Sequence, residues 1–148
     1  MYMQRISIPA DVDGFFSLEC PHCGERFKAF GKDIDANETI ELFCPFCGIP
    51  TEPNCFIPKS VKEHGTTLVE NELKTMINKT FKDLRRSTNR NKFLKVNLGR
   101  KLQHDVPNLL TEDDDLELIQ LDCCNKEIKV PTISKNSFIY CAYCGVEQ

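Results

Sequence analysis

The chain has 148 residues and a mass of 17.0 kDa, enough for one ordinary domain or a few very small ones. Hydrophobic residues make up 41% and charged residues 28%, and no stretch approaches the roughly 18 apolar residues that a membrane-spanning helix needs. The first 20 residues contain no apolar run typical of a signal peptide. These features exclude a transmembrane protein, and we expect a cytoplasmic one.

Charge is unevenly distributed along the chain, although the formal net charge is only -3. From Lys74 to Lys101, ten basic residues accompany one acid, Asp83, which gives a local net charge of +9. The other 120 residues carry a net charge of -12. An acidic chain is a poor general binder of polyanions, so any such binding is expected in the basic segment 74–101.

Short strands are expected in the first part of the chain. Ile6 and Ile8 alternate with polar residues in segment 5–9, which predicts a strand. From residue 15 to about 58, short apolar runs lie between glycines and prolines, a pattern that favours short strands over long helices. This region contains two CxxCG motifs, at residues 20–24 and 44–48.

The two CxxCG motifs predict a zinc site formed by Cys20, Cys23, Cys44 and Cys47. In a CxxC turn two thiolates can bind one ion, and the following glycine permits the positive φ that closes the turn. Four thiolates leave no open position for water or substrate, so the ion would be structural. A redox-active CxxC pair and an iron cluster are the alternatives.

A basic amphipathic helix is predicted at residues 67–86. Thr67 followed by Glu70 fits a capping box at its start. Side chains at three- and four-residue steps predict one buried stripe: Val69, Leu73, Met76, Ile77, Thr80, Phe81 and Leu84. Leu94, Val96 and Leu98 then alternate with polar residues and predict a strand.

The end of the chain repeats the cysteine-rich beginning. Residues 121–129 match residues 18–28 if two residues are missing between the thiols of the second copy, and residues 139–146 match 42–49 without a gap. The repeat predicts a second zinc site formed by Cys123, Cys124, Cys141 and Cys144. Side chains of neighbouring residues in a strand point to opposite faces, so the backbone must turn at the Cys123–Cys124 pair.

Alternatives remain for the second site. Only one cysteine of the adjacent pair need bind metal, with Cys55, His104 or no residue completing the site. A vicinal disulfide is a further alternative. Otherwise Cys55 is the odd thiol, and single cysteines usually behave as small buried hydrophobes.

The predicted fold is a small, zinc-stabilised α+β protein, with two β-rich zinc ribbons flanking a central basic helix and a strand. The domains are expected at residues 1–60 (N-terminal strand and first ribbon), 61–110 (helix and strand connector) and 111–148 (second, degenerate ribbon). Ribbons of roughly 35 to 45 residues are near the size at which a core rarely suffices without a metal. Folding should therefore require zinc, and chelation should melt the first ribbon.

In these motifs the chain resembles double zinc-ribbon proteins, similar to the ribbons of transcription factor IIB and RNA polymerase subunits. It is also similar to small, largely uncharacterised bacterial zinc-ribbon proteins, through residues 14–15, 19–24 and 27–28 and the C-terminal Cys123, Cys124, Cys141 and Cys144. The resemblance covers the two ribbons, about half the chain. It implies nucleic-acid or protein binding without choosing between them.

Nucleic-acid backbone binding by segment 74–101 is the function that the sequence favours. Phe81 lies on the apolar stripe and is expected in the core rather than stacked on bases. The alternative is a protein adaptor or regulatory subunit that uses the ribbons and helix as docking surfaces, and a third possibility is that the helix faces the acidic loop 112–115 or solvent. The candidate contact residues are Lys82, Arg85, Arg86, Arg90, Lys92 and Lys95.

Catalysis is not expected. The sequence contains no phosphate-binding GxxxxGK[ST] loop, no HExxH pair and no GxSxG motif. No His-x-Glu precedes either CxxCG motif, as a deaminase-type zinc site would require. Nothing in the sequence points to a small-molecule substrate.

Overall fold

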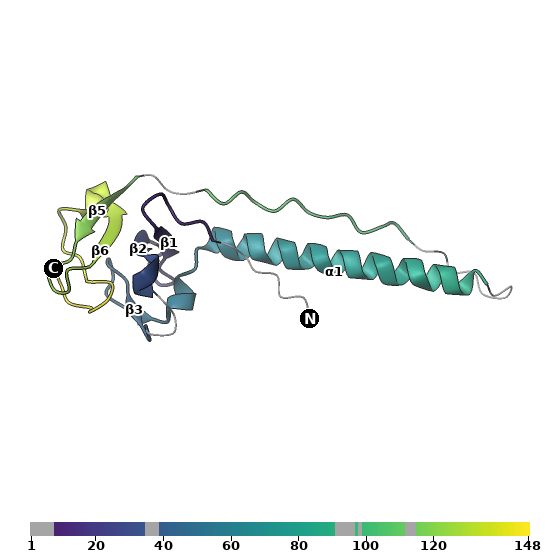
Figure 1. Ribbon diagram of the computed structural model, residues 1–148, viewed down its shortest axis with the longest axis horizontal. Helices are drawn as coiled ribbons and strands as arrows, with labels where there is room; N and C mark the ends of the chain where they lie inside the picture. The colour runs from purple at the N-terminus through teal and green to yellow at the C-terminus, as the bar shows by residue number, and fades with distance from the viewer. Residues whose placement is uncertain (1–7, 35–38, 91–96, 98, 112–114) are drawn as a thin grey trace. The chain divides into compact units, whose positions relative to one another are not determined.

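The computed structural model describes residues 8–34, 39–90, 97, 99–111 and 115–148. It divides into two compact units (Figure 1): Met1–Lys62 with Leu110–Gln148, called here the metal unit, and Glu63–Leu109, called the arm. Antiparallel strands and one long helix make this an α+β chain, as predicted. The strands expected at 5–9 and 94–98 fall mostly on residues outside the described ranges. No helix in the described ranges is both long and apolar enough to cross a membrane.

Two β-hairpins from opposite ends of the chain form one four-stranded antiparallel sheet. The first hairpin contains β1 (Phe15–Glu19) and β2 (Arg26–Phe30), and the second contains β5 (Leu116–Gln120) and β6 (Glu127–Pro131). The strand order is β1-β2-β6-β5, so β2 and β6 join the hairpins at the centre (Figure 1). A separate two-stranded sheet pairs β3 (Leu42–Phe43) with β4 (Pro50–Thr51).

The two hairpins are related by an internal repeat that needs no gap. A constant offset of 101 residues relates β1 to β5 and β2 to β6, and relates the short 3-10 helix Gly31–Ile34 to Thr132–Ser134. Equivalent residues Lys28 and Lys129 face each other in the β2–β6 pairing, the register that a two-fold axis at this point produces. The expectation that the second copy lacks two residues is therefore wrong, because its turn has the same length.

The second cysteine motifs of the two copies also contact each other reciprocally. The N–H of Phe43 donates to the carbonyl of Ala142, and the N–H of the equivalent Tyr140 donates to the carbonyl of Pro45, both at 2.8 Å. A Cβ on Gly145 would lie 2.7 Å from the Phe43 ring, and its φ of 71° is also unfavourable for other residues. This close approach locks the two copies together.

One hydrophobic core serves both copies. Phe27 and Ala29 on β2 point to the same side of the sheet as Ile128 and Val130 on β6, as the two-residue period of a strand requires. The arrangement of two ribbons flanking a central helix is therefore not confirmed, because the ribbons are joined by a sheet and a core. The fully buried members of this core come from both ends of the chain: Phe27, Ala29, Leu42, Phe56, Leu121, Ile128 and Val130.

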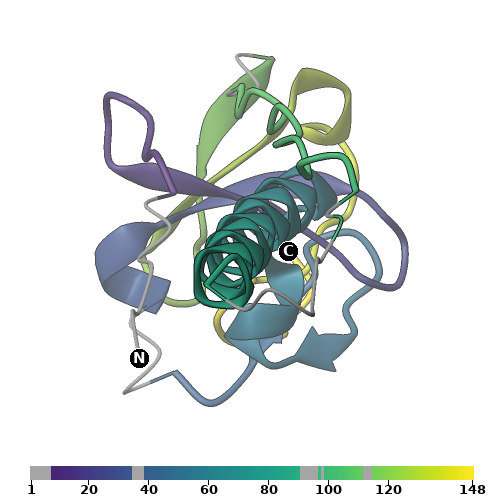
Figure 2. The same cartoon turned by 90° about the vertical axis from the view of Figure 1, so that its right-hand side faces the viewer.

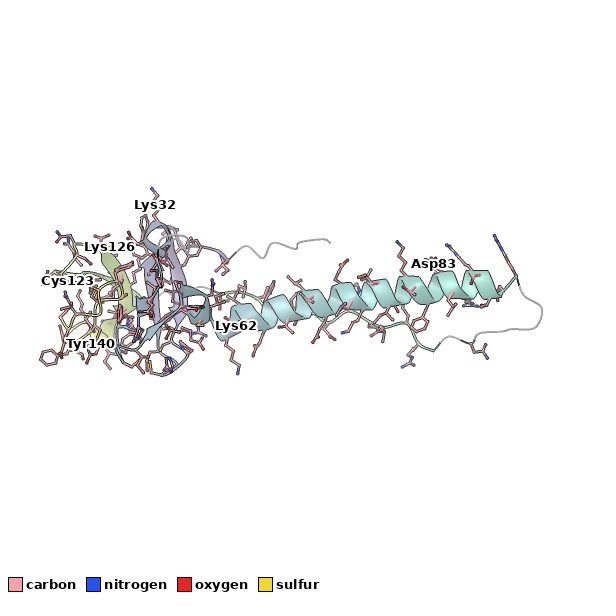
Figure 3. The ribbon with its side chains drawn as sticks, turned by 90° about the horizontal axis from the view of Figure 1, so that it is seen from below. Lys32, Lys62, Asp83, Cys123, Lys126 and Tyr140 are labelled. Atoms are coloured by element: carbon pink, nitrogen blue, oxygen red, sulfur yellow. The ribbon has the colours of Figure 1, made fainter. Side chains whose placement is uncertain are left out.

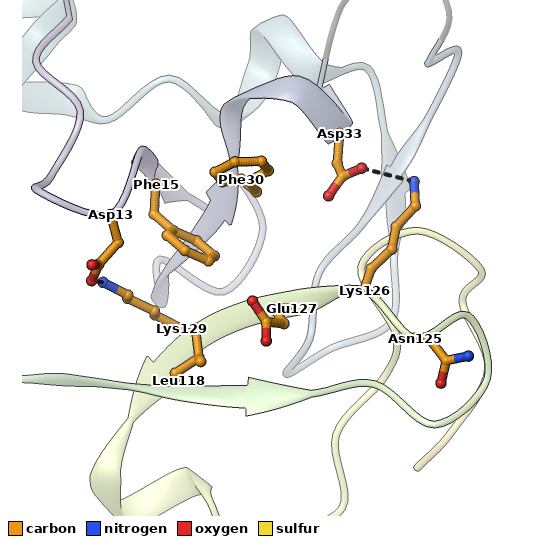
Figure 4. Close-up of a pocket in the computed structure, with 9 residues that line it drawn as sticks. All are labelled: Asp13, Phe15, Phe30, Asp33, Leu118, Asn125, Lys126, Glu127 and Lys129. Carbon is orange, nitrogen blue, oxygen red and sulfur yellow. Dashed lines mark hydrogen bonds and ion pairs between the residues drawn. The ribbon is translucent and has the colours of Figure 1, made fainter.

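The opposite face of the sheet carries a buried charge cluster. Lys28 is only 2% exposed, and its Nζ lies 3.5 Å from the Asp11 carboxylate. Lys129 donates to the same carboxylate at 2.8 Å. It also donates to Asp13 at 2.6 Å, as Figure 4 shows. Burial alone would raise the pKa of Asp11, but the hydrogen bonds from Lys129 and from backbone N–H groups lower it to about 2.

A cavity of about 560 Å³ lies beside this cluster, with Lys126 and Lys129 among the residues that line it (Figure 4). Both lysines belong to the second copy and pair with acids of the first, Lys126 with Asp33 at 3.4 Å and Lys129 with Asp13. These ion pairs therefore add to the contacts that join the copies.

The long helix α1 (Lys59–Thr88) begins eight residues before the predicted start. The N–H of Lys59 donates to the Glu19 carboxylate at 3.4 Å, so a residue distant in sequence satisfies a free amide at the helix start. Thr67 does not form the expected cap, because its hydroxyl donates to the carbonyl of Glu63 inside the helix. The capping box is therefore wrong, while the predicted end at residue 86 lies close to the observed one.

In the arm, an extended segment at residues 102–108 returns along α1 (Figures 1 and 2). Asn71 donates to the carbonyl of Asp105 at 2.7 Å and accepts from its N–H at 2.8 Å, and Asn78 pairs in the same way with Leu102. His64 Nδ1 donates to the carbonyl of Asn108 at 2.7 Å.

The spacing of these contacts explains why they repeat. Residues 64, 71 and 78 are seven apart, which is two helical turns or about 10.5 Å. Their partners 108, 105 and 102 are three apart, which is about 10 Å of extended chain. The polar side chains at positions 64, 71 and 78, called here the ladder, therefore form hydrogen bonds with the backbone of the returning segment.

We expect Asp11→Asn to lower the free energy of unfolding by about 1–3 kcal/mol at pH 7, because two largely buried ammonium groups lose this carboxylate. The pKa of Asp11 is about 2 in the folded chain and 3.8 unperturbed, so its contribution is present above about pH 4 and is lost as the pH falls towards 2. Urea unfolding of the metal-loaded protein measures the difference.

Asp13→Asn is the matched control. Its side chain is 60% exposed, so we expect a loss below about 1 kcal/mol. Equal effects of the two substitutions would contradict the role given to Asp11.

Candidate metal centres

The first predicted set of thiols converges in the structure. The sulfurs of Cys20, Cys23, Cys44 and Cys47 all lie within 4.8 Å of one another. Cys20 and Cys47 sulfurs are 3.7 Å apart, and those of Cys23 and Cys44 are 3.6 Å apart. A tetrahedral site with Zn–S bonds of about 2.3 Å has S–S edges of about 3.8 Å, whereas a disulfide bond is about 2.05 Å long. The spacing therefore fits one metal ion and excludes disulfides.

Backbone turns place these thiols. The turn after β1 is closed by a hydrogen bond from the N–H of Gly24 to the carbonyl of Cys20 at 2.9 Å, and Gly48 closes the second turn onto Cys44 in the same way. Gly24 and Gly48 have φ of 76° and 69°, as predicted from the glycine that follows each motif.

Amides inside the turns point at the sulfurs. The N–H of His22 lies 3.4 Å from the Cys20 sulfur, and the N–H of Phe46 lies 3.4 Å from the Cys44 sulfur. Burial tends to raise the pKa of Cys20, but backbone hydrogen bonds from Cys23 and His22 give a net lowering of its pKa. Burial raises the pKa of Cys44 above its usual range. All four thiols can therefore be deprotonated at neutral pH only when a cation binds them, because metal binding displaces their protons.

The second set, Cys123, Cys124, Cys141 and Cys144, also has all four sulfurs within 4.8 Å of one another. The sulfurs of Cys124 and Cys141 are 3.6 Å apart. The required turn is present at residues 122–124, so both members of the adjacent pair reach the cluster. The prediction of two separate sites, each able to hold one metal ion, is confirmed.

The turn between β5 and β6 has the same backbone as the turn between β1 and β2, with a different placement of one thiol. The N–H of Asn125 donates to the carbonyl of Leu121, just as Gly24 donates to Cys20, and Asn125 has a φ of 56°. Leu121 therefore stands where the first copy has Cys20, and it is buried in the core. Cys123 occupies the position of His22 and supplies the missing thiol.

Burial and the neighbouring thiols raise the pKa of Cys123 to about 12. Without a metal this thiol is protonated at neutral pH, and binding must displace its proton. Both sets consist of four thiols and leave no position for substrate, which fits structural metal sites.

The other candidate ligands lie outside both sets. Cys55 is exposed and not buried as expected of a single cysteine. His104 Nε2 lies 2.8 Å from the Thr75 hydroxyl.

The basic residues predicted for binding are only partly brought together. Lys82 and Arg85 line a groove of about 920 Å³ in the arm, between α1 and the returning segment. Arg86 and Arg90 are exposed but are not among the residues that line it, and Lys92 and Lys95 lie outside the described ranges.

Three other cations that line the groove belong to the predicted segment 74–101 but were not among the six candidate contact residues. Arg100 and Lys101 join Lys79 at the groove, because the returning segment brings them back to the helix. Phe81 is 48% exposed and also lines the groove, so its expected core position is wrong. The seven-residue spacing of His64, Asn71 and Asn78 was the signal for this pairing.

Searches of family models, curated proteins and solved structures gave no significant match.

We expect the purified protein to contain two metal ions per chain, because each set provides four thiols. Cys141→Ser should remove about one ion, since it takes one thiolate from the second set only. Elemental analysis measures the stoichiometry, and cobalt substitution reports tetrahedral thiolate coordination through its absorption.

Cys55→Ser is the matched control, because this exposed thiol lies outside both sets. It should retain two ions. One ion or none in the wild-type protein would contradict the assignment of two sites.

Proposed function

We propose that this chain is a non-catalytic structural-zinc protein that binds the phosphate backbone of a nucleic acid through the basic groove of the arm. Zinc is the metal that sets of four thiolates in CxxC-type turns favour. The metal unit acts as a rigid support in this proposal, and the arm makes the contact.

The observation that carries the proposal is the composition of the groove. Among the described residues that line it, there is no acid, although the whole chain is acidic. Five cations in one groove can neutralise several consecutive phosphates. They come from both walls: Lys79, Lys82, Arg85, Arg100 and Lys101.

Phe81 adds a second kind of contact. Its half-exposed ring lies among the groove cations, where a base of a single strand can stack on it. Contacts to phosphates carry no direct sequence information, so the proposal predicts broad recognition with a preference for flexible single strands.

We expect the protein to bind labelled duplex and single-stranded oligonucleotides, with affinity that falls steeply with salt. About five phosphate contacts give a log–log salt slope near -4 for a duplex, or several hundred-fold weaker binding between about 50 and 200 mM salt. Fluorescence anisotropy measures both affinities.

Arg85→Glu should weaken binding about tenfold or more at low salt, because it reverses a charge inside the groove. Lys32→Glu makes the same kind of change at an exposed site of the metal unit and should have little effect. An absence of binding at low salt would overturn the proposal and leave the adaptor function, for which a nuclease-resistant copurifying partner is the test.

A further inference from the structure

Figure 3 draws the side chains that project from α1, and the apolar stripe of this helix remains exposed along the arm. A 30-residue helix normally buries such a stripe, since packing of the apolar face provides most of its stability. Thr80 belongs to the same stripe, and its hydroxyl donates to the carbonyl of Met76 within the helix. The exposed fractions are 41–58% for Val69, Leu73, Met76, Ile77 and Leu84.

The returning segment cannot cover this stripe. At 100° per residue, the ladder positions 64, 71 and 78 lie on the side of α1 opposite to Leu73 and Met76. The described part of the returning segment is held on that polar face by the Asn71 and Asn78 pairs. The described residues of the arm therefore leave the apolar face open to a partner.

Charge along the arm helix indicates which partner fits. Residues 63–73 contain three glutamates and no Lys or Arg, whereas residues 74–90 contain six basic residues and one acid. A helix with one acidic and one basic half is complementary to its own reversed copy.

A row of charged residues beside the stripe is also complementary to its own reversed copy. Glu72, Lys79 and Arg86 are seven residues apart and lie along one side of the stripe. In an antiparallel pair these rows meet each other, so Glu72 of each copy approaches the basic residues of the other. A parallel pair would instead bring acidic half against acidic half.

We propose that the arm binds a second copy of this chain, with the two α1 helices packed antiparallel through their apolar stripes. Pairing the stripe about its midpoint places Val69 opposite Leu84 and the acidic residues opposite the basic end. The ladder face lies on the far side of each helix, so the groove cations other than Lys79 stay available. The association therefore does not depend on nucleic-acid binding.

The test is self-association of the full, metal-loaded chain by sedimentation equilibrium over a range of concentrations. The wild type should dimerise, and the double variant Leu73→Glu/Met76→Glu should raise the dissociation constant about tenfold or more, because it puts charges in the seam. Ile133→Glu is the matched control, since this residue of the metal unit is 88% exposed, and it should dimerise like the wild type.

Charge variants test the orientation without altering the stripe. Glu72→Lys alone and Arg86→Glu alone should each weaken self-association, because each places like charges opposite one another, and neither residue lines the groove. An equimolar mixture of the two should restore dimerisation as a heterodimer. Circular dichroism checks that the helix persists in every variant.

Three results would overturn the proposal: a wild type that stays monomeric, a stripe variant that dimerises as well as the wild type, or a mixture that fails to associate. Each can occur with or without nucleic-acid binding. The failure of this inference is thus distinguishable from the failure of the proposed function.

Discussion

Convergence of four sulfurs onto one ion is the constraint on which the metal unit depends. Each set ties together two turns that are distant in sequence, since Cys23 and Cys44 are 21 residues apart and Cys124 and Cys141 are 17 residues apart. Structural zinc provides about 10–16 kcal/mol in such peptides. The two sets do not act separately, because β2 and β6 pair and the Phe43 and Tyr140 backbones bond across the copies. Loss of either ion should therefore strain the shared core.

The sequence predicts the metal sets well because their chemistry is local. A CxxCG turn needs only five residues, and the second site was recognised from the repeat. Aligning the two copies by their cysteines introduces a gap that the structure does not have. The buried Leu121 takes the place of Cys20, so the turn keeps its length, and Cys123 lies in the middle of the turn. Matching residues by their position in the turn, rather than by residue type, gives the correct alignment of the two copies.

Long-range contacts were not predictable in the same way. The β2–β6 pairing joins residues about 100 apart, and Glu19 caps a helix that starts 40 residues later. The ladder at Asn71 and Asn78 depends on the returning segment, whose residues have no strand pattern. The arm consequently has two distinct faces, one polar and basic for the proposed nucleic-acid contact, the other apolar for the proposed pairing.

The central claim is that two thiolate-bound ions and one shared core make the metal unit a single cooperative structure. Hydrogen exchange followed by mass spectrometry during a chelator titration tests it most directly. The account predicts that protection of the β1–β2 and β5–β6 hairpins is lost together as metal is removed. Protection that persists in both hairpins after complete metal removal, or that is lost from one hairpin while the other stays folded, would contradict it.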